Sequence, residues 1–273
     1  MSTTLQASET FVWPDGIQAA ATVTVNFAGE SAEHSTMPLP LWGRNAHGRY
    51  GAQQGVYNLL ELFRRYDVTA TFFIGGWDAE RYPEAMGAIA SAGHEIAGQG
   101  YLHEDFSKLS LDEQRAVLER SEATHERVFG RKPLGFRAPD RLMSRETRGL
   151  LAERGYRFDS SYCDDDQPYV VEIEGRRLAE LPTHEPWIDK TYYEKHRVAR
   201  VVTGSFLDEF DATYGIGGLF SLGIHPRGDY GSGRGGRVRA LEPLLRAFRE
   251  HPGLWLATCG EIAAWTLGEA DEG

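Results

Sequence analysis

The chain has only two cysteines, Cys163 and Cys259, among 273 residues. They could form at most one disulfide, and neither belongs to a zinc-type C-x-x-C pair, so we expect a reduced protein of the cytoplasm. No apolar run approaches the roughly 20 residues that a membrane span needs. The first residues also lack the basic and apolar stretches of an export signal. These absences predict a cytoplasmic protein without a membrane partner.

Basic runs are missing as well. The net charge is −11, from 29 Lys and Arg against 40 Asp and Glu. An acidic chain without a Lys/Arg-rich stretch is a poor ligand for nucleic acid or for an anionic membrane, so we expect neither as a partner. The composition is that of an ordinary globular protein, and the length suits one α/β domain over residues 1–273.

Apolar, β-branched runs alternate with amphipathic segments along the chain. Residues 19–27 and 68–74 predict buried parallel strands, and 55–66 has helical spacing. We expect further strands at 95–98, 132–140 (with its loop), 156–162, 177–182, 218–225 and 254–257, helices at 83–92, 110–129, 144–154, 202–214, 237–251 and 261–267, and a long loop at 31–51. Strands that alternate with helices predict βα units, and about seven of them favour a distorted (β/α)7-8 barrel.

Polar side chains follow five of these strands. In a parallel barrel the reactive groups lie at the carboxyl ends of the strands. The residues in such places are Asn26 and Glu30, Gln99 and His103, Arg137 and Asp140, Asp159, and His225. The strand pattern therefore predicts a site at one mouth of the barrel.

The stretch 93–105, G-H-E-I-A-G-Q-G-Y-L-H-E-D, places Gln99 and His103 four residues apart. A His at position 99 would complete an H-x-x-x-H pair whose imidazoles converge on zinc. The stretch resembles the third-strand motif of the polysaccharide deacetylase family (NodB homology, carbohydrate esterase family 4), which is close to G-H-E-I-x-x-H-G-Y-x-H-x-D. Every fixed position matches except 99.

The resemblance covers nearly the whole chain, because all five family motifs have counterparts. G-R-Y-G-A-Q-Q-G at 48–55, D-D-Q-P-Y at 165–169, and A-E-L-P at 179–182 with Trp187 resemble one branch. That branch holds intracellular peptidoglycan-deacetylase-like proteins, cyclic imidases and the PuuE-type allantoinase. The resemblance implies a NodB-type barrel that lacks one strand of eight, and a homo-oligomer.

The residues at the metal positions depart from the family pattern. In metal-dependent members the first strand ends in two carboxylates, one the general base and the other a zinc ligand. Asn26 and Ala28 stand there in this chain, and only His103 remains of the family's Asp-His-His triad. A catalytic zinc normally has three protein ligands, so we expect no metal and no other cofactor. Recruitment of Glu30 or Asp105 to a metal beside His103 is the alternative.

Other parts of the family's machinery are present. By resemblance, Arg137 orients the base, Asp159 is the fourth-motif Asp, and His225, in L-G-I-H-P at 222–226, is the catalytic acid. The metal-independent allantoinase branch also begins its site with an Asn and a following Gly-Glu, which Asn26 and Gly29-Glu30 resemble. Ala28 departs from that branch too.

The charge of Arg137 adds a condition on the substrate. A desolvated guanidinium without an anion is costly, so we expect Asp159 or Glu30 to neutralise it, or an anionic substrate to do so through the bidentate geometry of Arg. The expected substrate-binding residues are Asn26, Glu30, Gln99, Arg49 and Asp140.

These observations predict a metal-independent hydrolase acting on a non-peptide C–N bond of a small molecule such as a cyclic imide, ureide or amide. His225 would transfer protons, and His103, Asn26 and Gln99 would hydrogen-bond the developing oxyanion. Arg137 and Asp159 would orient these groups. Three alternatives stay open: a zinc-dependent N-deacetylase with rearranged ligands, an isomerase or cyclase, and a catalytically inactive binding protein.

Overall fold

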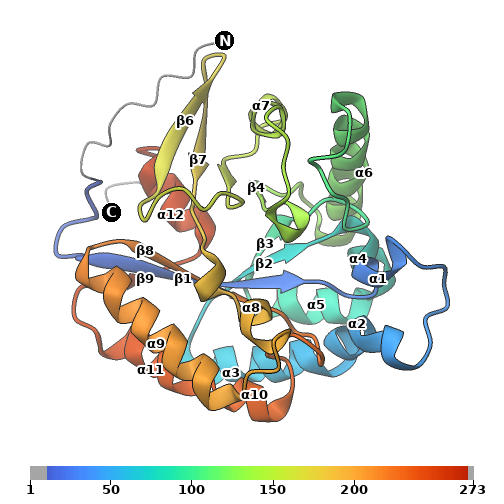
Figure 1. The fold of residues 1–273 in the computed structure, drawn as a ribbon. Coiled ribbons are helices and arrows are strands. Elements are labelled where there is room, and N and C mark those ends of the chain that lie inside the picture. Colours follow the sequence, from blue (N-terminus) through green and yellow to red (C-terminus); the bar gives the residue numbers. More distant parts are fainter. Residues whose placement is uncertain (1–10, 270–273) are drawn as a thin grey trace.

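The structure is a computed structural model that describes residues 11–269. The first residues, in which we expect no export signal, lie outside the described part. A nine-stranded sheet has the order β6-β7-β5-β4-β3-β2-β1-β8, and β9 also pairs with β1. The sheet curls into an open barrel, with helices around its outside (Figure 1). The predicted distorted (β/α)7-8 barrel is confirmed. No helix among the described residues has the length and apolar character that a bilayer crossing requires.

The strands are β1 (Ala19–Phe27), β2 (Thr71–Ile74), β3 (Glu95–Gly98), β4 (Gly135–Phe136), β5 (Phe158–Asp159), β6 (Tyr169–Ile173), β7 (Arg176–Glu180), β8 (Leu219–Ile224) and β9 (Leu254–Leu256). The longer helices are α3 (Val56–Tyr66), α5 (Pro83–Ser91), α6 (Leu111–Phe129), α7 (Thr147–Glu153), α9 (Ala199–Gly215), α11 (Glu242–Glu250) and α12 (Cys259–Thr266). Shorter helices are α1 (Ser31–His34), α2 (His47–Tyr50), α4 (Gly76–Arg81), α8 (Asp189–Tyr193) and α10 (Gly235–Arg239). All neighbouring strands are parallel except β6 and β7.

Alternation along β1 determines which side chains reach the barrel interior. Successive side chains of a strand point to opposite faces. Val23, Val25 and Phe27 pack outward in a core with residues of α3, α9 and α11. Thr24 and Asn26 therefore point inward, where both accept a hydrogen bond from an interior arginine. This alternation places the polar side chain of Asn26 inside the barrel, at the carboxyl end of β1.

The segment after β7 spans the gap between β7 and β8. Thr183 donates its hydroxyl to the carbonyl of Ser221 in β8, at 3.5 Å. Ile188 then forms an isolated parallel bridge with Gly223. Ile188 also packs so closely against Gly223 that a Cβ there would lie 2.9 Å from its Cγ1. The chain thus crosses to β8 without a regular strand, and its next residues, α8, reach the mouth of the barrel.

Several expected elements differ in the structure. The expected loop at 31–51 contains α1, a 3-10 turn (Gly43–Ala46) and α2. The expected helix at 237–251 is two helices, α10 and α11, because Pro243 at the start of α11 cannot donate the backbone hydrogen bond that a continuous helix needs. The strand β6 and the helix α4 were not predicted. The capping box of Ser110 and Glu113 at the start of α6 is confirmed.

Candidate functional site

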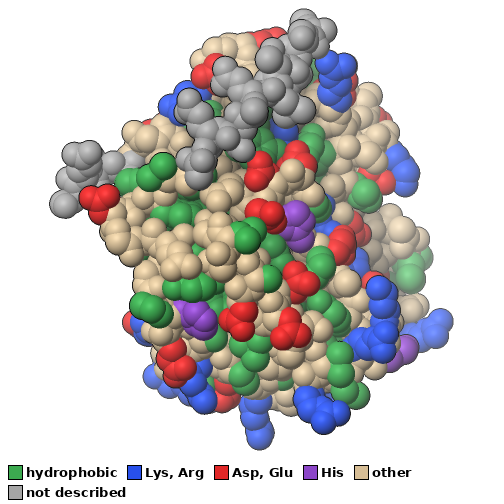
Figure 2. Space-filling view, turned by 60° about the vertical axis from the view of Figure 1, so that its left-hand side comes forward, with side chains coloured by type: hydrophobic (Ala, Val, Ile, Leu, Met, Phe, Trp, Pro, Cys, Tyr) green, Lys and Arg blue, Asp and Glu red, His purple; other side chains and the backbone are tan. Residues whose placement is uncertain are grey.

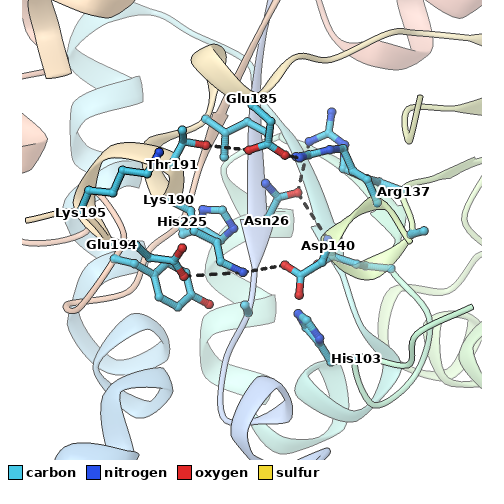
Figure 3. Close-up of a pocket in the computed structure, with 16 residues that line it drawn as sticks. Asn26, His103, Arg137, Asp140, Glu185, Lys190, Thr191, Glu194, Lys195 and His225 are labelled. Atoms are coloured by element: carbon cyan, nitrogen blue, oxygen red, sulfur yellow. Dashed lines mark hydrogen bonds and ion pairs between the residues drawn. The ribbon is translucent and has the colours of Figure 1, made fainter. Parts of the chain in front are cut away.

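A cavity of about 340 Å³ lies at the carboxyl ends of the strands (Figure 3). Six of the nine predicted site residues line it: Asn26, Gln99, His103, Arg137, Asp140 and His225. The other lining residues are Ala28, Ala138, Arg141, Glu185, Ile188, Lys190, Thr191, Glu194, Lys195 and Tyr230. The strand ends therefore bring together groups that lie up to 199 positions apart in the chain, from Asn26 to His225.

His225 reaches the cavity just beyond the end of β8, and Asp189 of α8 holds its ring. Nδ1 of His225 lies 2.7 Å from Oδ1 of Asp189. The other carboxylate oxygen accepts the backbone N–H groups of His225, at 2.9 Å, and Ser232, at 2.7 Å. A carboxylate acceptor at Nδ1 favours the tautomer with its proton there, so Nε2 keeps a lone pair. The pair is suited to proton transfer at Nε2.

Arg137 is buried, and all five of its N–H groups have neutral acceptors. Nε donates to the carbonyl of Ser160 at 2.9 Å, and Nη2 donates to the hydroxyls of Ser160 at 2.7 Å and Ser221 at 3.5 Å. Nη1 donates to Thr24 at 2.8 Å and to Asn26 at 3.2 Å. Burial lowers the pKa of Arg137 to about 10. With its donors occupied, Arg137 has no N–H left for the bidentate grip on a substrate that we expected.

Within residues 11–269 no carboxylate forms an ion pair with Arg137, so neither Asp159 nor Glu30, the two expected candidates, neutralises it by direct contact. Asp159 stabilises the charged form of the Arg137 guanidinium by electrostatic attraction, without a direct contact. Glu30 instead bonds to Arg49, 2.8 Å away, and to the hydroxyl of Tyr82. Glu30 is buried in that contact, so neither it nor Arg49 lines the cavity.

Arg137 also decides how the amide of Asn26 is turned. Oδ1 of Asn26 accepts from Nη1 of Arg137 at 3.2 Å and from Nε2 of Gln99 at 3.4 Å. A guanidinium can only donate, so Oδ1 must face it and Nδ2 must face away. Figure 3 shows this nitrogen directed away from Arg137, on the side of His225. The cavity thereby gains a donor, Asn26 Nδ2, and an acceptor, Oε1 of Gln99.

His103 lines the cavity as a neutral imidazole. Burial lowers its pKa, and the nearby Asp140 only partly offsets this. His103 has a left-handed backbone with φ of 59°, and so do Asp140, at 48°, and Arg141, at 60°. Such strained residues cluster where a structure holds side chains in place for function. Three of them on one cavity support its reading as the functional site.

Two ion pairs join the loop after β4 to the segment that contains α8. Lys190 Nζ lies 2.7 Å from Oδ1 of Asp140, and Arg141 pairs with Glu185. Burial opposes ionisation of Asp140, but Lys190 outweighs it and lowers the pKa of that carboxyl. The predicted residue Asp140 is thus an anion of the cavity, already paired with a cation that we did not predict.

Asp159 lies outside the cavity, in a buried carboxyl pair with Glu180. Its Oδ1 accepts the hydroxyl of Ser161 at 2.6 Å. Glu180 accepts backbone N–H groups of Ser161 and Tyr162 and pairs with Arg148 at 2.9 Å. Burial raises the pKa of Asp159, and burial and Asp159 raise that of Glu180 well above its ordinary value. This position fits a structural proton-sharing pair better than the catalytic role predicted for Asp159.

The carboxyl pair should make stability depend on pH. Because its proton is held more tightly in the folded chain than in the unfolded chain, the stabilisation is complete below the ordinary carboxyl range, near pH 4, and is lost as pH rises through the raised pKa. Glu180→Gln, which mimics a protonated Glu180, should weaken this dependence. Urea denaturation from pH 4 to 8 would measure it, with Glu119→Gln, an exposed glutamate, as the matched control. An unchanged pH profile in Glu180→Gln would contradict the shared proton.

The family resemblance implies a divalent metal, but the residues present do not fit one. The ligand positions hold the methyl group of Ala28, the amide of Gln99 and one imidazole, His103, and the amide of Asn26 stands at the position of the general base. Within residues 11–269 no group of three or more His, Cys, Asp or Glu side chains is placed to hold a metal. Recruitment of Glu30 or Asp105 to a metal beside His103 is not supported either. Glu30 is bound to Arg49, and Asp105 pairs with Lys108 away from the cavity.

The sequence pattern missed the wall formed by residues 185–195. It contributes Glu185, Lys190 and Lys195 to the cavity and Asp189 to His225. No buried strand precedes these residues directly, so the strand-end argument did not reach them. The one available signal was a pair of charged residues, Asp189 and Lys190, shortly after Trp187, a residue that the resemblance includes.

Comparisons with known proteins agree with this fold. The family model for polysaccharide deacetylase matches residues 50–158. The crystal structure of a candidate polysaccharide deacetylase from Mycobacterium smegmatis is 32% identical, covers 97% of this chain and 96% of its own, and has a TM-score of 0.89. The structure of PuuE allantoinase, at 23% identity, covers 92% and 91% with a TM-score of 0.79, which shows a common fold.

A curated relative matches a shorter part of the chain. The peptidoglycan deacetylase of Helicobacter pylori is 33% identical over 129 residues, which are 47% of this chain and 44% of that protein. This chain therefore spans less than half the length of that relative. This match therefore gives no basis for assigning the substrate of that relative to this chain.

Proposed function

Because the chain belongs to the polysaccharide deacetylase family, we propose that it is a hydrolase that cleaves a non-peptide C–N bond of a small molecule without a metal. The observation that carries the proposal is the Asp189–His225 pair, which presents Nε2 to a cavity whose metal positions hold Ala28 and Gln99. A cyclic imide, ureide or amide is the substrate class that this set of groups suits. A fold neighbour that bears the name allantoinase is consistent with the barrel serving substrates other than polysaccharides.

The proposed reaction begins with attack of water on a substrate carbonyl. Nε2 of His225 takes a proton from the water as the new C–O bond forms. Asp189 stabilises the resulting imidazolium through Nδ1. His225 then returns the proton to the leaving nitrogen as the C–N bond breaks. One histidine thus serves as base and acid in turn, and no proton is lost or gained overall.

The oxyanion of the tetrahedral intermediate needs donors that are already in place. Asn26 Nδ2 is such a donor, because Arg137 holds the amide in one orientation. The neutral ring of His103 supplies a second N–H when its proton is on the nitrogen that faces the substrate. Gln99 Oε1 is placed to accept an N–H of an imide or ureide, a group that an ester or a ketone lacks.

Turnover in the presence of a chelator tests this proposal. The purified protein, treated with EDTA and then assayed with succinimide and with dihydrouracil, should open at least one ring at a rate unchanged by the treatment. Loss of ultraviolet absorbance on ring opening follows the reaction. Activity that disappears with EDTA and returns with zinc would refute metal independence. Release of acetate from N-acetylglucosamine oligomers, without ring opening, would instead indicate a polysaccharide deacetylase.

A further inference from the structure

The cavity has a charge opposite to that of the chain. Its basic side chains are Arg137, Arg141, Lys190 and Lys195, and its acidic ones are Asp140, Glu185 and Glu194. Four cations against three anions give +1 when the histidines are counted as neutral, whereas the whole chain carries −11. Figure 2 shows acidic side chains spread over one outer face of the molecule. The cavity should therefore attract an anionic ligand more strongly than most of the protein surface does.

Two of the four cations, Lys190 and Lys195, have amines with spare N–H donors. Arg137 has no free N–H, and Arg141 is held by Glu185 through Nη2 while its Nε is buried without a partner among the described residues. Lys190 has three N–H donors. In the part of the chain that the structure describes, only Asp140 lies within hydrogen-bond distance of its Nζ, and Glu194 is 3.9 Å away. Lys195 is exposed and forms no ion pair within residues 11–269. Lys190 and Lys195 therefore line the cavity with N–H donors that a ligand can use.

Asp140 indicates which chemical group suits Lys190. Its carboxylate lies 2.7 Å from Nζ, inside the cavity, so a carboxylate oxygen is accommodated at this amine. The ring of Tyr230 lies 5.2 Å from Nζ, within the range of a cation–π contact. The buried charge of Arg137, which no described carboxylate neutralises directly, adds a further attraction for an anion.

We propose that Lys190 and Lys195 form a subsite for a carboxylate of the substrate, so that the enzyme prefers cyclic imides, ureides or amides that carry a carboxylate. The preference for such substrates rests on the proposed hydrolytic function, whereas the carboxylate subsite rests only on the cavity. Binding and turnover therefore test the two separately.

Calorimetry with succinate and with succinamide, its uncharged diamide, tests the subsite. Succinate should bind more tightly than succinamide at low ionic strength. Lys190→Met should weaken succinate binding about ten- to hundredfold, because hydrogen bonds to charged groups are the stronger class. Lys195→Met should weaken it about two- to fivefold, because this amine is exposed. Lys108→Met, at an exposed lysine away from the cavity, should change nothing.

Asp140→Asn provides a test with the opposite sign. The substitution removes the carboxylate that competes for Lys190, so succinate should bind about two- to fivefold more tightly. Weaker succinate binding in Asp140→Asn, equal binding of succinate and succinamide, or no effect of Lys190→Met would each overturn the subsite.

Turnover of two related rings then tests the substrate class. Dihydroorotate and dihydrouracil share a ureide ring, but only the first carries a carboxylate. The wild type should have the larger kcat/KM for dihydroorotate, and Lys190→Met should reduce the ratio of the two values about tenfold or more. Faster hydrolysis of dihydrouracil would refute the preference while supporting the hydrolase. Succinate binding that requires Lys190, with no ring or amide hydrolysed, would support the subsite and refute the hydrolase.

Discussion

Replacement of His225 by Ala is expected to lower kcat for ring opening about 10²- to 10⁴-fold, because general acid–base groups contribute rate factors of that size. KM should change little, since the proton in transit stabilises the transition state more than the bound substrate. Steady-state kinetics on the substrate that the wild type turns over best would measure both values. Retention of the full rate by His225→Ala would place the proton transfer on another group.

Asp189→Asn separates the orientation of His225 from its presence. The carboxylate of Asp189 accepts three hydrogen bonds, two from His225 and one from the backbone N–H of Ser232. An Asn at this position can accept only through its amide oxygen, and its amide nitrogen would face one of these donors. The imidazole would lose its fixed tautomer and the anion that stabilises its charged form, so kcat should fall while His225 remains in place. Steady-state kinetics on the same substrate would measure this fall in kcat. An unchanged kcat in Asp189→Asn would argue against a role of Asp189 in catalysis.

Asn26→Asp is expected to lower kcat about 10²- to 10³-fold, the range found when an oxyanion donor is removed. The amide nitrogen that faces the cavity would become a carboxylate oxygen, which repels a developing oxyanion. The same change should stabilise the fold at neutral pH, by roughly 1–3 kcal/mol, because Arg137 would gain a charged partner where it now has a neutral one at 3.2 Å. Activity and stability should therefore change in opposite directions.

A double-mutant cycle with Arg137→Met tests this second expectation. In the Arg137→Met background, Asn26→Asp would place a carboxylate in the interior without its cation, so the stabilisation should disappear or reverse. Urea denaturation of the four proteins at pH 7 gives the coupling. Equal effects of Asn26→Asp in both backgrounds would show that Arg137 does not act on position 26. Full activity of Asn26→Asp would show that Nδ2 is not the donor.

Most of the fold follows from local patterns in the sequence. The run 19–27 alternates Thr or Asn with Val or Phe at its end, and the structure has β1 at those residues, with Val23 and Val25 outward and Asn26 inward. Such a pattern is readable because neighbouring side chains of a strand point to opposite faces. The hairpin strand β6 was missed because its residues are only half-buried, so their hydrophobic pattern is weak.

The sequence by itself determined that polar groups gather at the strand ends and that the usual metal ligands are replaced by Ala28 and Gln99. Residue identity and strand position suffice for the first conclusion, and the second follows from the family resemblance. Only the tertiary structure decided which groups are partners. The pairing of Asp189 with His225, the turn of the Asn26 amide toward Arg137, and the exclusion of Asp159 from the cavity all depend on long-range packing. The physical reason is that hydrogen bonds and burial join segments far apart in the chain. For Asp189, the position follows from how residues 181–188 cross from β7 to β8.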